Sequence, residues 1–502
     1  MPEQKRLNSE DREFFITVKT ASLSNPFSEK RIVLDQTISG TGSHQIDETV
    51  NAVEQRIEML ERNPQIDLKS LSDPDRNLIE AAHLFIFFYR FRKKFDRFIE
   101  EQLTAEDKTF LAPFTGDGVS VPFAGEGISF LLKRGFKTES IQKAFEESYQ
   151  LRRAFFFIDR NLIGRSPAMK KLRYDLWNNI FTHDIDLYRR YLWNKMEDFS
   201  TLILGKTGTG KGAAAAAIGR SGFIPFDMKK QRFVHNFTKS FISINLSQFP
   251  ETLIESELFG HKKGSFTGAT ENHKGVFERC SPLGSILLDE IGEVSLPIQI
   301  KLLQVLQERI FYPVGSHKAE KFNGRVIAAT NRSVAELRKN NTFRDDFYYR
   351  LCSDIIMIPS LQQRIQEDPK ELNDLLDLII ERTVGEPSKE LAGMVRAVID
   401  KRLGMDYPWP GNVRELEQCV RRVLLKKEYC GDHLPDSPDL NVRLIQGIEQ
   451  GDISAQNLLS GYCKILYNRY GTFEEVSRRT KLDRRTVNKY IREWSEDTQE
   501  DD

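Results

Sequence analysis

An apolar segment, a glycine-rich loop and an alanine-rich segment follow one another between residues 201 and 220. TLIL at 201–204 has the composition of a buried strand, and it continues directly into GKTGTGKG at 205–212 and AAAAAIGR at 213–220. Glycines let successive backbone N–H groups converge on phosphate oxygens, and the N-terminus of the following helix favours negative charge. A strand, a glycine loop and a helix in this order predict a nucleotide-binding α/β domain.

Lys211 is predicted to place its ammonium on the β- and γ-phosphates of ATP. The generic motif has serine or threonine after this lysine as a Mg²⁺ ligand, whereas this chain has Gly212. The residues predicted to bind the nucleotide in this loop are Gly205, Lys206, Thr207, Gly208, Thr209, Gly210, Lys211 and Gly212.

Three further apolar segments end in polar side chains. SILLD is followed by Glu290, so that Asp289 is predicted to bind Mg²⁺ and Glu290 to polarise a water molecule. In isolation the two carboxylates would more simply cap the next helix, but the phosphate loop upstream favours the nucleotide role. RVIAAT ends at Asn331 and FISIN ends at Asn245. Strands that alternate with helices predict a parallel sheet with its ligand at the C-terminal ends of the strands.

Hydrolysis of the phosphoanhydride bond of ATP needs positive charge on the developing transition state. Arg344 and Arg350 are candidates, and they would act best on the nucleotide of a neighbouring subunit, which requires a ring. Ordinary ion pairing with Asp345 and Asp346 explains them equally well. Arg414 lies in the first turn of a predicted helix after WPGN, from which it could reach back to the nucleotide.

The polar segment ESELFGHKKGSFTGA at 255–269 lies between two apolar runs. Glycines at 264 and 268 let a loop turn sharply, because glycine adopts positive φ without steric cost. Between them the loop presents Phe266 beside the hydroxyl of Thr267. An isolated hexapeptide of this kind is usually a solvated surface loop. Its position between the phosphate loop and the acidic strand end indicates a functional loop instead.

The first 155 residues carry no motif that identifies a ligand. Residues 46–62 and 76–103 have helical spacing, and basic residues interleave with the aromatic ones in the second segment. This segment is interpreted as a helix that packs its aromatic face into a core, in preference to a nucleic-acid or ligand surface. The aromatic residues concerned are Phe85, Phe87, Phe88, Phe91, Phe95 and Phe98.

Charge and cysteine content indicate which partners and which cellular compartment suit the chain. Lysine plus arginine equals aspartate plus glutamate at 73 each, so contact with nucleic acid needs a local basic patch. Five dispersed cysteines without a CxxC pair indicate reduced thiols and therefore a cytoplasmic protein. No apolar run approaches the length of a membrane span, and the first residues lack the apolar region of a signal peptide.

Near the C-terminus, GTFEEVSRRTKLDRRTVNKYIR at 471–492 has the spacing of a helix-turn-helix and an excess of basic residues. A helix is predicted at 474–480, a turn at 481–483 and a recognition helix at 484–492. A solvated basic helix is the alternative to DNA binding. The residues predicted to meet bases or phosphates are Arg484, Arg485, Thr486, Asn488 and Lys489.

Six motifs in this order resemble the central domain of bacterial sigma-54-dependent transcription activators, the AAA+ enhancer-binding proteins. They are GKTGTGKG, ESELFGHKKGSFTGA, ILLDEIGE, AATNR, FRDDFYYRL and WPGNVRELE. The resemblance covers about residues 162–430 and does not extend to residues 1–155. It implies a ring-forming ATPase, usually a hexamer, that remodels the closed complex of sigma-54 RNA polymerase so that the promoter opens.

The resemblance also implies roles for individual residues. Asn245 matches the residue that switches Glu290, Asn331 lies in the sensor I motif, and Arg414 matches sensor II. Arg344 and Arg350 match the arginines that act on the neighbouring subunit. Ile163 and Gly164, at the start of the matching region, join the nucleotide-binding residues. The residues implied to contact sigma-54 are Gly264, Ser265, Phe266, Thr267, Gly268 and Ala269.

The chain departs from the family pattern at several positions. Gly212 stands where the family usually has glutamate, Ser265 replaces alanine, and Lys262 replaces glutamate. In FYPVGS at 311–316, Pro313 and Ser316 replace the arginine and glycine of the usual FYRVGG. These changes surround the Phe-Thr pair of the loop but leave the pair itself intact.

Four regions are therefore expected. A mainly helical regulatory domain (1–155), which senses a signal and represses or licenses ring assembly, precedes a P-loop AAA+ domain with a helical lid (156–430). A linker (431–465) leads to the helix-turn-helix domain (466–495). The expected function is an ATP-hydrolysing activator that binds upstream enhancer DNA and sigma-54 RNA polymerase. The alternatives are a DNA-binding regulator that keeps the AAA+ fold without acting on sigma-54, and an AAA+ protein-remodelling motor.

Overall fold

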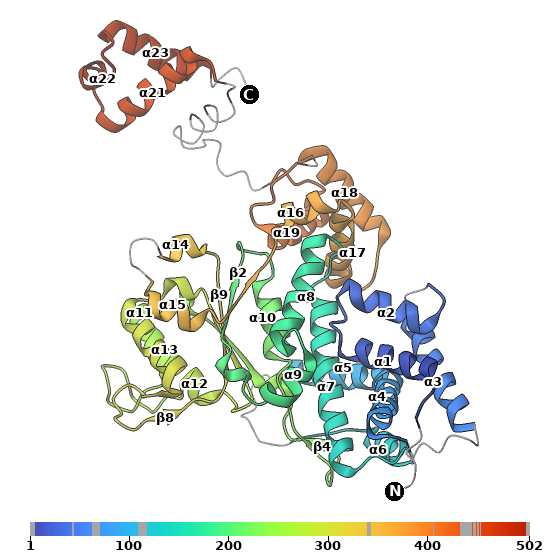
Figure 1. The fold of residues 1–502 in the computed structure, drawn as a ribbon. Coiled ribbons are helices and arrows are strands. Elements are labelled where there is room, and N and C mark those ends of the chain that lie inside the picture. Colours follow the sequence, from blue (N-terminus) through green and yellow to red (C-terminus); the bar gives the residue numbers. More distant parts are fainter. Residues whose placement is uncertain are drawn as a thin grey trace. The chain divides into compact units, whose positions relative to one another are not determined.

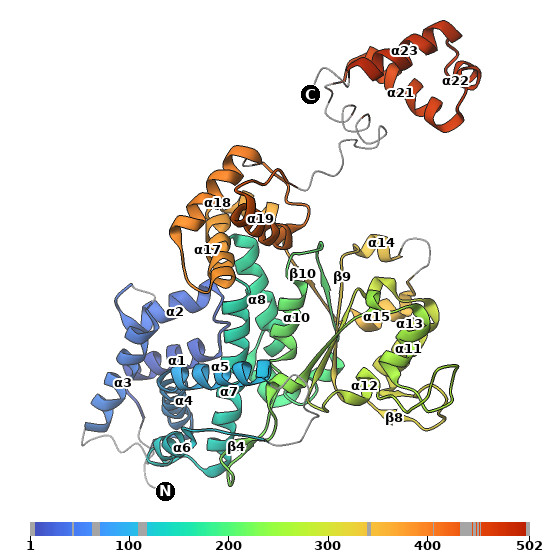
Figure 2. The same cartoon turned by 180° about the vertical axis from the view of Figure 1, so that it is seen from behind.

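The structure is a computed structural model that describes residues 6–42, 45–62, 71–108, 118–338, 343–404, 406–431 and 453–497, with isolated positions between 444 and 451. The chain forms two compact units (Figures 1 and 2). One comprises residues 1–400 and 404–427, and the other comprises residues 401–403 and 428–502. None of the helices in the described part of the chain combines the length and hydropathy that a bilayer span requires.

A parallel five-stranded sheet forms the centre of the first unit, with the strand order β10-β2-β9-β6-β5 (Figure 1). The four strands that the sequence predicts are confirmed with the expected bounds, and β10 is added at one edge. Every residue of β2 and β9 is buried, as their apolar composition predicts. The strands are β2 (Thr201–Leu204), β5 (Phe241–Asn245), β6 (Ser285–Asp289), β9 (Arg325–Thr330) and β10 (Asp354–Met357).

Alternate strand residues face two different cores, because successive side chains of a strand point to opposite faces. Ile203 and Ile327 join the core beneath α7 (Thr138–Asn161), α8 (Pro167–Phe181) and α10 (Lys211–Gly219). Leu202 and Val326 join the core on the other face. That second face is covered by α11 (Glu251–Phe259), α12 (Val276–Arg279), α13 (Leu296–Glu308) and α15 (Asp345–Leu351).

The N-terminal helices share the first of these cores and lie beside α7 in both views (Figures 1 and 2). The predicted aromatic helix consists of two helices, which meet at Phe91. Five of its six phenylalanines are buried, which confirms their core role, and Phe88 is half-buried. The helices are α1 (Ser9–Leu23), α2 (Glu29–Ser39), α3 (Ile46–Arg62), α4 (Asp73–Arg90), α5 (Arg92–Lys108) and α6 (Ala124–Leu132).

A small antiparallel sheet ties the N-terminal helices to the hairpin that follows α10. Its strands β1 (Val119–Ser120), β4 (Arg232–Phe233) and β3 (Phe226–Asp227) pair in that order. The ring of Tyr149 on α7 stacks on Phe233 with centroids 4.0 Å apart. The residues between α10 and β5 therefore serve as a packing surface for the N-terminal region.

A helical bundle completes the first unit beside the C-terminal ends of the strands, above the sheet in Figure 1. It comprises α16 (Leu361–Glu367), α17 (Lys370–Val384), α18 (Lys389–Arg402) and α19 (Asn412–Lys426). The short α14 (Val334–Arg338) follows β9.

The described residues of the second unit from 453 onward form a three-helix domain comprising α21 (Ala455–Tyr470), α22 (Phe473–Thr480) and α23 (Arg484–Asp497). The last two helices begin and end within one residue of the predicted helix, turn and recognition helix, except that α23 continues to Asp497. Val476, Val487 and Ile491 form their core with Cys463 and Leu466 of α21. Helix α21 begins inside the 431–465 segment that the sequence assigns to a linker.

His83 on α4 makes the first unit sensitive to acid. Its side chain is buried, and burial together with the positive charge of Arg134 lowers the pKa of His83 to about 4. The carboxylate of Glu61 lies 3.9 Å away, but it is half exposed and does not offset the burial. In the unfolded chain His83 binds a proton near pH 6.5, whereas in the folded chain it is protonated only near pH 4. The free energy of unfolding therefore falls as the pH drops from 6.5 to 4.

We expect His83 to remove about 2 kcal/mol of unfolding free energy between pH 7 and pH 5, at roughly 1.4 kcal/mol per pH unit of the window. Urea unfolding of wild type and His83→Gln at both pH values measures this loss as the difference between their pH dependences. Equal pH dependence of the two proteins would show that His83 is not the responsible group.

Candidate functional site

The glycine loop lies where β2 ends and α10 begins, and the helical bundle packs directly against it. Gly208 has φ +77°, and a β-carbon built on it would lie 2.1 Å from the carbonyl oxygen of Gly411. The backbone N–H of Val413 donates to the carbonyl of Gly208 at 3.1 Å. The side-chain amide of Asn412 donates to the carbonyl of Thr207 at 3.0 Å. The turn at WPGN thus clamps the loop, and only glycine fits at position 208.

Lys211 is the first residue of α10, and its side chain is buried within the loop. Its ammonium donates to the carbonyl of Gly205 at 3.0 Å and lies 3.5 Å from that of Lys206. Gly210, at φ +102°, precedes it and faces open space. The backbone N–H groups at the helix start and the lysine charge converge on one volume that suits phosphate groups. Gly212 also faces open space, so the structure gives no steric reason for glycine there.

Asp289 is the last residue of β6, which lies two strands from β2 with β9 between them. Glu290 follows Asp289 in a left-handed conformation, at φ +56°, which is uncommon for a residue with a side chain. Its carboxylate accepts a hydrogen bond from the backbone N–H of Asn331 at 3.4 Å. The amide of Asn331 in turn donates to the hydroxyl of Thr207 in the phosphate loop, also at 3.4 Å. Glu290, Asn331 and the loop therefore form one connected set.

Asn245 ends β5 in register with Asp289, one strand further from the loop. Its side-chain oxygen accepts hydrogen bonds from the backbone N–H and the hydroxyl of Ser247, at 3.0 and 2.8 Å. In this structure the side chain caps the turn that leads into α11, rather than contacting Glu290.

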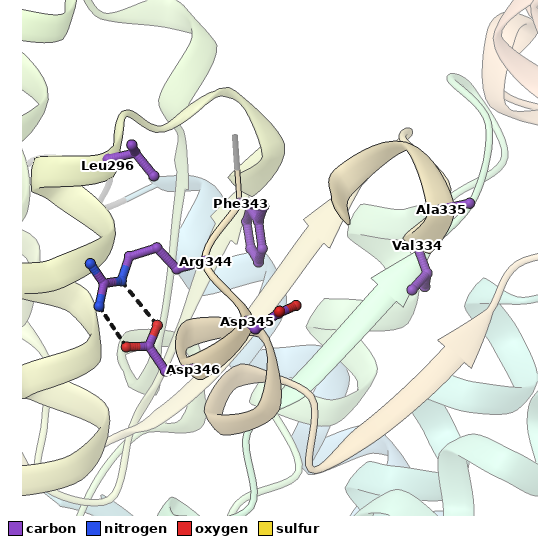
Figure 3. A pocket seen from close by; sticks show the side chains of 7 residues that line it. All are labelled: Leu296, Val334, Ala335, Phe343, Arg344, Asp345 and Asp346. Carbon is purple, nitrogen blue, oxygen red and sulfur yellow. Dashed lines mark hydrogen bonds and ion pairs between the residues drawn. The ribbon is translucent and has the colours of Figure 1, made fainter. Parts of the chain in front are cut away.

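Arg344 precedes α15 and lines an open hollow of about 1000 Å³ beside the start of α13 (Figure 3). Its guanidinium forms two bonds with Asp346, at 2.7 and 3.0 Å, and these bonds hold the pKa of the Asp346 carboxyl below its usual range. The guanidinium of Arg350 donates to the carbonyl of Leu306 at 3.2 Å. Both arginine side chains are exposed, and these contacts lie within α15 and α13 rather than at the phosphate loop.

Arg414 does lie beside the phosphate loop. A β-carbon on Gly208 would be 3.0 Å from the β-carbon of Arg414, and the arginine side chain is exposed. Ile163 and Gly164 are held by the bundle instead: the carbonyl of Ile163 accepts from Arg364 at 2.7 Å, and Gly164 packs on Glu371. Arg364 and Glu371 form a buried ion pair at 3.0 Å, which attaches this segment to α16 and α17.

The loop at 264–269 is closed on itself and projects between α11 and α12. The N–H of Gly264 donates to the carbonyl of Ala269 at 2.8 Å, and the N–H of Ala269 donates to that of Phe266 at 3.0 Å. Phe266 is 39% exposed and touches the ring of His261 edge-on, with centroids 4.9 Å apart. Thr267 is exposed beside it. An apolar ring and a hydroxyl are thus presented at the tip of a loop that backbone hydrogen bonds close.

A second loop supports the base of the first. It connects β7 (Ile310–Phe311) to β8 (Glu320–Lys321), and the N–H of Val314 donates to the carbonyl of Gly260 at 2.9 Å. The carbonyl of Val314 accepts from the N–H of Lys262 at 3.0 Å. Gly315 approaches Ser265 so closely that a β-carbon would lie 2.6 Å from that of the serine. The departures at Lys262, Ser265 and Pro313 therefore cluster where the two loops meet.

Asp483 fixes the start of α23 in the three-helix domain. One carboxylate oxygen accepts the backbone N–H groups of Arg485 and Thr486, at 2.9 and 3.1 Å, and the other accepts the hydroxyl of Thr486. Arg484 pairs with Glu474 at 2.7 Å. Arg485 and Lys489 are exposed, whereas Asn488 is half-buried. Arg484 and Thr486 thus already have partners within the domain.

Sequence reasoning did not find the contacts that join these parts. Gly411 and Asn412 lie some two hundred residues from the loop they clamp, and Glu371 is similarly remote from Gly164. The one available signal was the proline-glycine turn at WPGN, which marks a sharp change of direction but does not name its partner.

Gly208→Ala tests the clamp. A methyl group at 208 clashes with the backbone of Gly411 and forces an unfavourable φ, so we expect nucleotide affinity to fall at least about tenfold, or 1.4 kcal/mol. Gly210→Ala carries the same φ cost in open space and is the matched control. Titration with a fluorescent ATP analogue compares them. Equal losses in the two variants would mean that contact with Gly411 is irrelevant to binding.

Residues 185–356 match the protein family described as the sigma-54 interaction domain. The chain is 37% identical to the Nif-specific regulatory protein of Azotobacter vinelandii over 58% of this chain and 49% of that protein. It is 43% identical to nitrogen fixation protein VnfA of the same organism, over 47% of this chain and 42% of that one. It is 38% identical to the DNA-binding transcriptional regulator NtrC of Azospirillum brasilense, over 52% and 47%. The chain spans about half the length of these relatives.

Proposed function

We propose that this chain, whose residues 185–356 form a sigma-54 interaction domain, is an ATP-hydrolysing activator of sigma-54-dependent transcription. The observation that carries the proposal is that one α/β domain holds both a phosphate-binding loop linked to Glu290 and a closed surface loop that presents Phe266 and Thr267. The first provides the chemistry of ATP hydrolysis. The second provides a contact surface for sigma-54.

Each residue around the nucleotide has a distinct task in this proposal. Lys211 and the loop N–H groups hold the phosphates, while Glu290 orients a water molecule for attack and accepts its proton. Asn331 lies between Glu290 and Thr207, where it senses whether the γ-phosphate is present. Arg414 closes the site from the bundle, because its β-carbon already lies beside Gly208.

A Mg²⁺ ion fits this site only with help from the nucleotide. Asp289 is half-buried at a strand end, and in the described part of the chain no cluster of three His, Cys, Asp or Glu side chains could hold a metal. Mg²⁺ ordinarily binds one or two carboxylates together with phosphates and water molecules, so a single aspartate suits it. The ion would neutralise charge on the β- and γ-phosphates, with Asp289 as its protein ligand.

The nucleotide site connects to the surface loop through a short, stiff path. Asn245, in register with Asp289, caps the turn that leads into α11, and α11 ends at the base of the loop. A helix of nine residues transmits a displacement at one end to the other. We propose that exchange of the Asn245 side chain between Ser247 and Glu290 moves α11, and thereby raises or lowers Phe266 and Thr267.

We also propose that the active form is a homo-oligomeric ring, a hexamer in keeping with the family resemblance. Arg344 and Arg350 are exposed and contact only their own part of the domain in the interactions described above. An exposed ion pair such as Arg344–Asp346 contributes little, so a neighbouring subunit's nucleotide could attract the arginine away at small cost.

DNA binding belongs to the proposal through α23, where Asp483 fixes the first turn and Arg485 is exposed. We expect Arg485→Ala to lower affinity for duplex DNA and to reduce the slope of log K against log salt by about one. Arg478→Ala, which removes an exposed arginine already paired with Glu475, is the matched control. Fluorescence anisotropy at several salt concentrations measures both. An unchanged slope for Arg485→Ala would show that Arg485 does not contact DNA phosphates and would contradict the assignment of α23 to the DNA interface.

Promoter opening tests the activity as a whole. With sigma-54 RNA polymerase and a supercoiled template that carries a sigma-54 promoter, we expect permanganate-reactive thymines at the start site with ATP and none with ADP. Opening without the protein, or no opening with ATP, contradicts the proposal.

A further inference from the structure

A cavity of about 530 Å³ lies between the N-terminal helices and α8, away from the phosphate loop. We infer that it binds a small, flat, uncharged molecule that carries a hydrogen-bond-accepting oxygen. Its lining comes from the end of α1 and its connection to α2, from α2, α4, α5 and α7, and from Ile46 on α3, Trp177 on α8 and Arg189. The volume lies within the range of small-molecule sites, about 300–1,000 Å³.

Aromatic rings form much of the wall. Phe27 stacks on Phe155, with centroids 5.4 Å apart and planes 10° from parallel, and meets Trp177 edge-on at 6.1 Å. Phe88 and Tyr89 continue the wall on α4, and Phe88 is the phenylalanine of the aromatic segment that is not fully buried. Flat aromatic faces favour a flat ligand, because stacked and edge-to-face contacts both require a planar partner.

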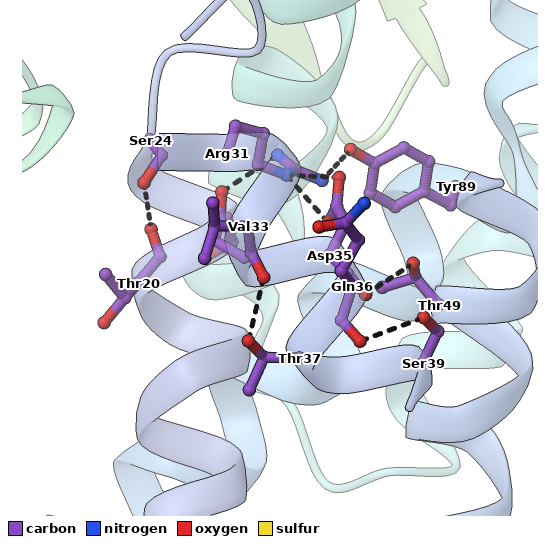
Figure 4. A network of polar contacts seen from close by, with 12 residues as sticks. Thr20, Ser24, Arg31, Val33, Asp35, Gln36, Thr37, Ser39, Thr49 and Tyr89 are labelled. Atoms are coloured by element: carbon purple, nitrogen blue, oxygen red, sulfur yellow. Dashed lines mark hydrogen bonds and ion pairs between the residues drawn. The ribbon is translucent and has the colours of Figure 1, made fainter. Parts of the chain in front are cut away.

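One hydrogen-bond donor of the wall has capacity to spare. The hydroxyl of Tyr89 accepts from Arg31 at 2.6 Å, which leaves its own hydrogen to donate (Figure 4). The Nε1–H of Trp177 has no accessible surface, so the indole contributes its ring and not its donor to the wall. An oxygen atom on a ligand would give the Tyr89 hydroxyl an acceptor.

Six of the eight charged residues of the lining form three ion pairs with one another, and Arg92 pairs with Asp47 at 2.8 Å. Figure 4 shows the guanidinium of Arg31 held between Asp35 and Tyr89, and its Nε lies 2.9 Å from a carboxylate oxygen of Asp35. Arg152 pairs with Asp96 at 2.7 Å, and Arg189 pairs with Glu147 at 2.8 Å. A charged ligand would leave its own charge without a partner or break one of these pairs, which is costly in a buried site. The lining therefore favours an uncharged molecule.

Ordinary imperfect packing does not account for the cavity. Voids larger than a water molecule are few in folded proteins, and those that stay empty are lined by apolar groups alone. This cavity has the Tyr89 hydroxyl and three ion pairs among its lining residues and the volume of many atoms. Its occupant is either a ligand or a group of water molecules, and binding measurements separate the two.

Isothermal titration of the full chain with 2-naphthol tests the inference, because this probe is flat, uncharged and carries one oxygen. We expect saturable binding with one site per chain. Tyr89→Phe, which keeps the ring but removes the hydroxyl donor, should weaken binding at least about fivefold. Tyr191→Phe, which alters an exposed tyrosine outside the cavity lining, should leave binding unchanged.

Two further measurements complete the test. Ala144→Leu adds volume to the cavity wall and should abolish binding, and thermal unfolding confirms that each variant is folded. Naphthalene-2-carboxylate, the charged counterpart of the probe, should bind at least about tenfold more weakly. A wild type without saturable binding would show that the cavity holds water only and overturn the inference. Equal affinity of wild type and Tyr89→Phe, or tighter binding of the carboxylate, would overturn it as well.

Discussion

Glu290→Gln is expected to lower the rate of ATP hydrolysis by roughly 10²–10⁴-fold, the usual contribution of a general base, while nucleotide affinity stays within about twofold. Glutamine has the shape of glutamate, and its amide oxygen still accepts the N–H of Asn331. The left-handed backbone at 290 is therefore retained, as is the link through Asn331 to Thr207. Only the ability to take a proton from the attacking water is lost.

Steady-state ATPase rates and titration with a fluorescent nucleotide measure the two effects separately. Glu293→Gln is the matched control, because Glu293 lies three residues further on and pairs with Arg332 at the surface. We expect its rate to stay near that of wild type. A Glu290→Gln enzyme that keeps a tenth or more of the wild-type rate would show that another group activates the water.

Thr267→Ala is expected to separate ATP hydrolysis from promoter opening. Thr267 is exposed at the tip of the closed loop, and exposed substitutions usually change stability by less than about 0.5 kcal/mol. ATPase activity should therefore remain within about twofold of wild type. Loss of one contact at the centre of an interface should lower promoter opening at least about tenfold, equivalent to ~1.4 kcal/mol.

Thr270→Ala is the control for this prediction, because Thr270 is an exposed threonine just outside the hexapeptide. Permanganate reactivity at a sigma-54 promoter and ATPase rates are measured on the same preparations. If Thr267→Ala opens the promoter as well as Thr270→Ala does, the hydroxyl of Thr267 has no part in the contact.

Local patterns predicted the elements of the central domain with good accuracy. The strands TLIL, FISIN, SILLD and RVIAAT have the expected bounds, because each is a short apolar run with a polar residue or glycine at its end. The turn before α23 was equally clear, since Asp483 has the side chain that caps a helix start. Short-range physical chemistry is sufficient for features of this kind.

Contacts between remote segments were not predictable from the sequence. Nothing in the local sequence of Gly208 reveals that Gly411 lies against it, and the capping of Ser247 by Asn245 depends on one side-chain rotation. The cavity beside Trp177 is built from helices that are up to about 150 residues apart. Its aromatic wall appeared in the sequence only as an amphipathic helix, since the hollow arises from how the helices meet.

The N-terminal helices share a core with α8 and α10, and this bears on how regulation can be studied. Deleting residues 1–155 would expose apolar faces of α8 and α10 and so destabilise the domain. A change in the ATPase rate of the truncated protein could then come from lost regulation or from lost stability. Point substitutions in the cavity wall leave this core in place. We propose that the N-terminal region acts on the ATPase through α8, whose N-cap Ser166 donates its backbone N–H to the carboxylate of Glu371 in the bundle at 2.9 Å.

Capture of sigma-54 is the most direct measurement of the central claim, that nucleotide state at Glu290 controls contact by the loop at 264–269. The full chain is incubated with purified sigma-54 and ADP–aluminium fluoride, ADP or no nucleotide, and complexes are separated by native electrophoresis. We expect a stable complex with ADP–aluminium fluoride only, and its loss in Thr267→Ala but not in Thr270→Ala. A complex that forms equally without nucleotide, or that Thr267→Ala forms as well as wild type, would contradict the assignment of this loop.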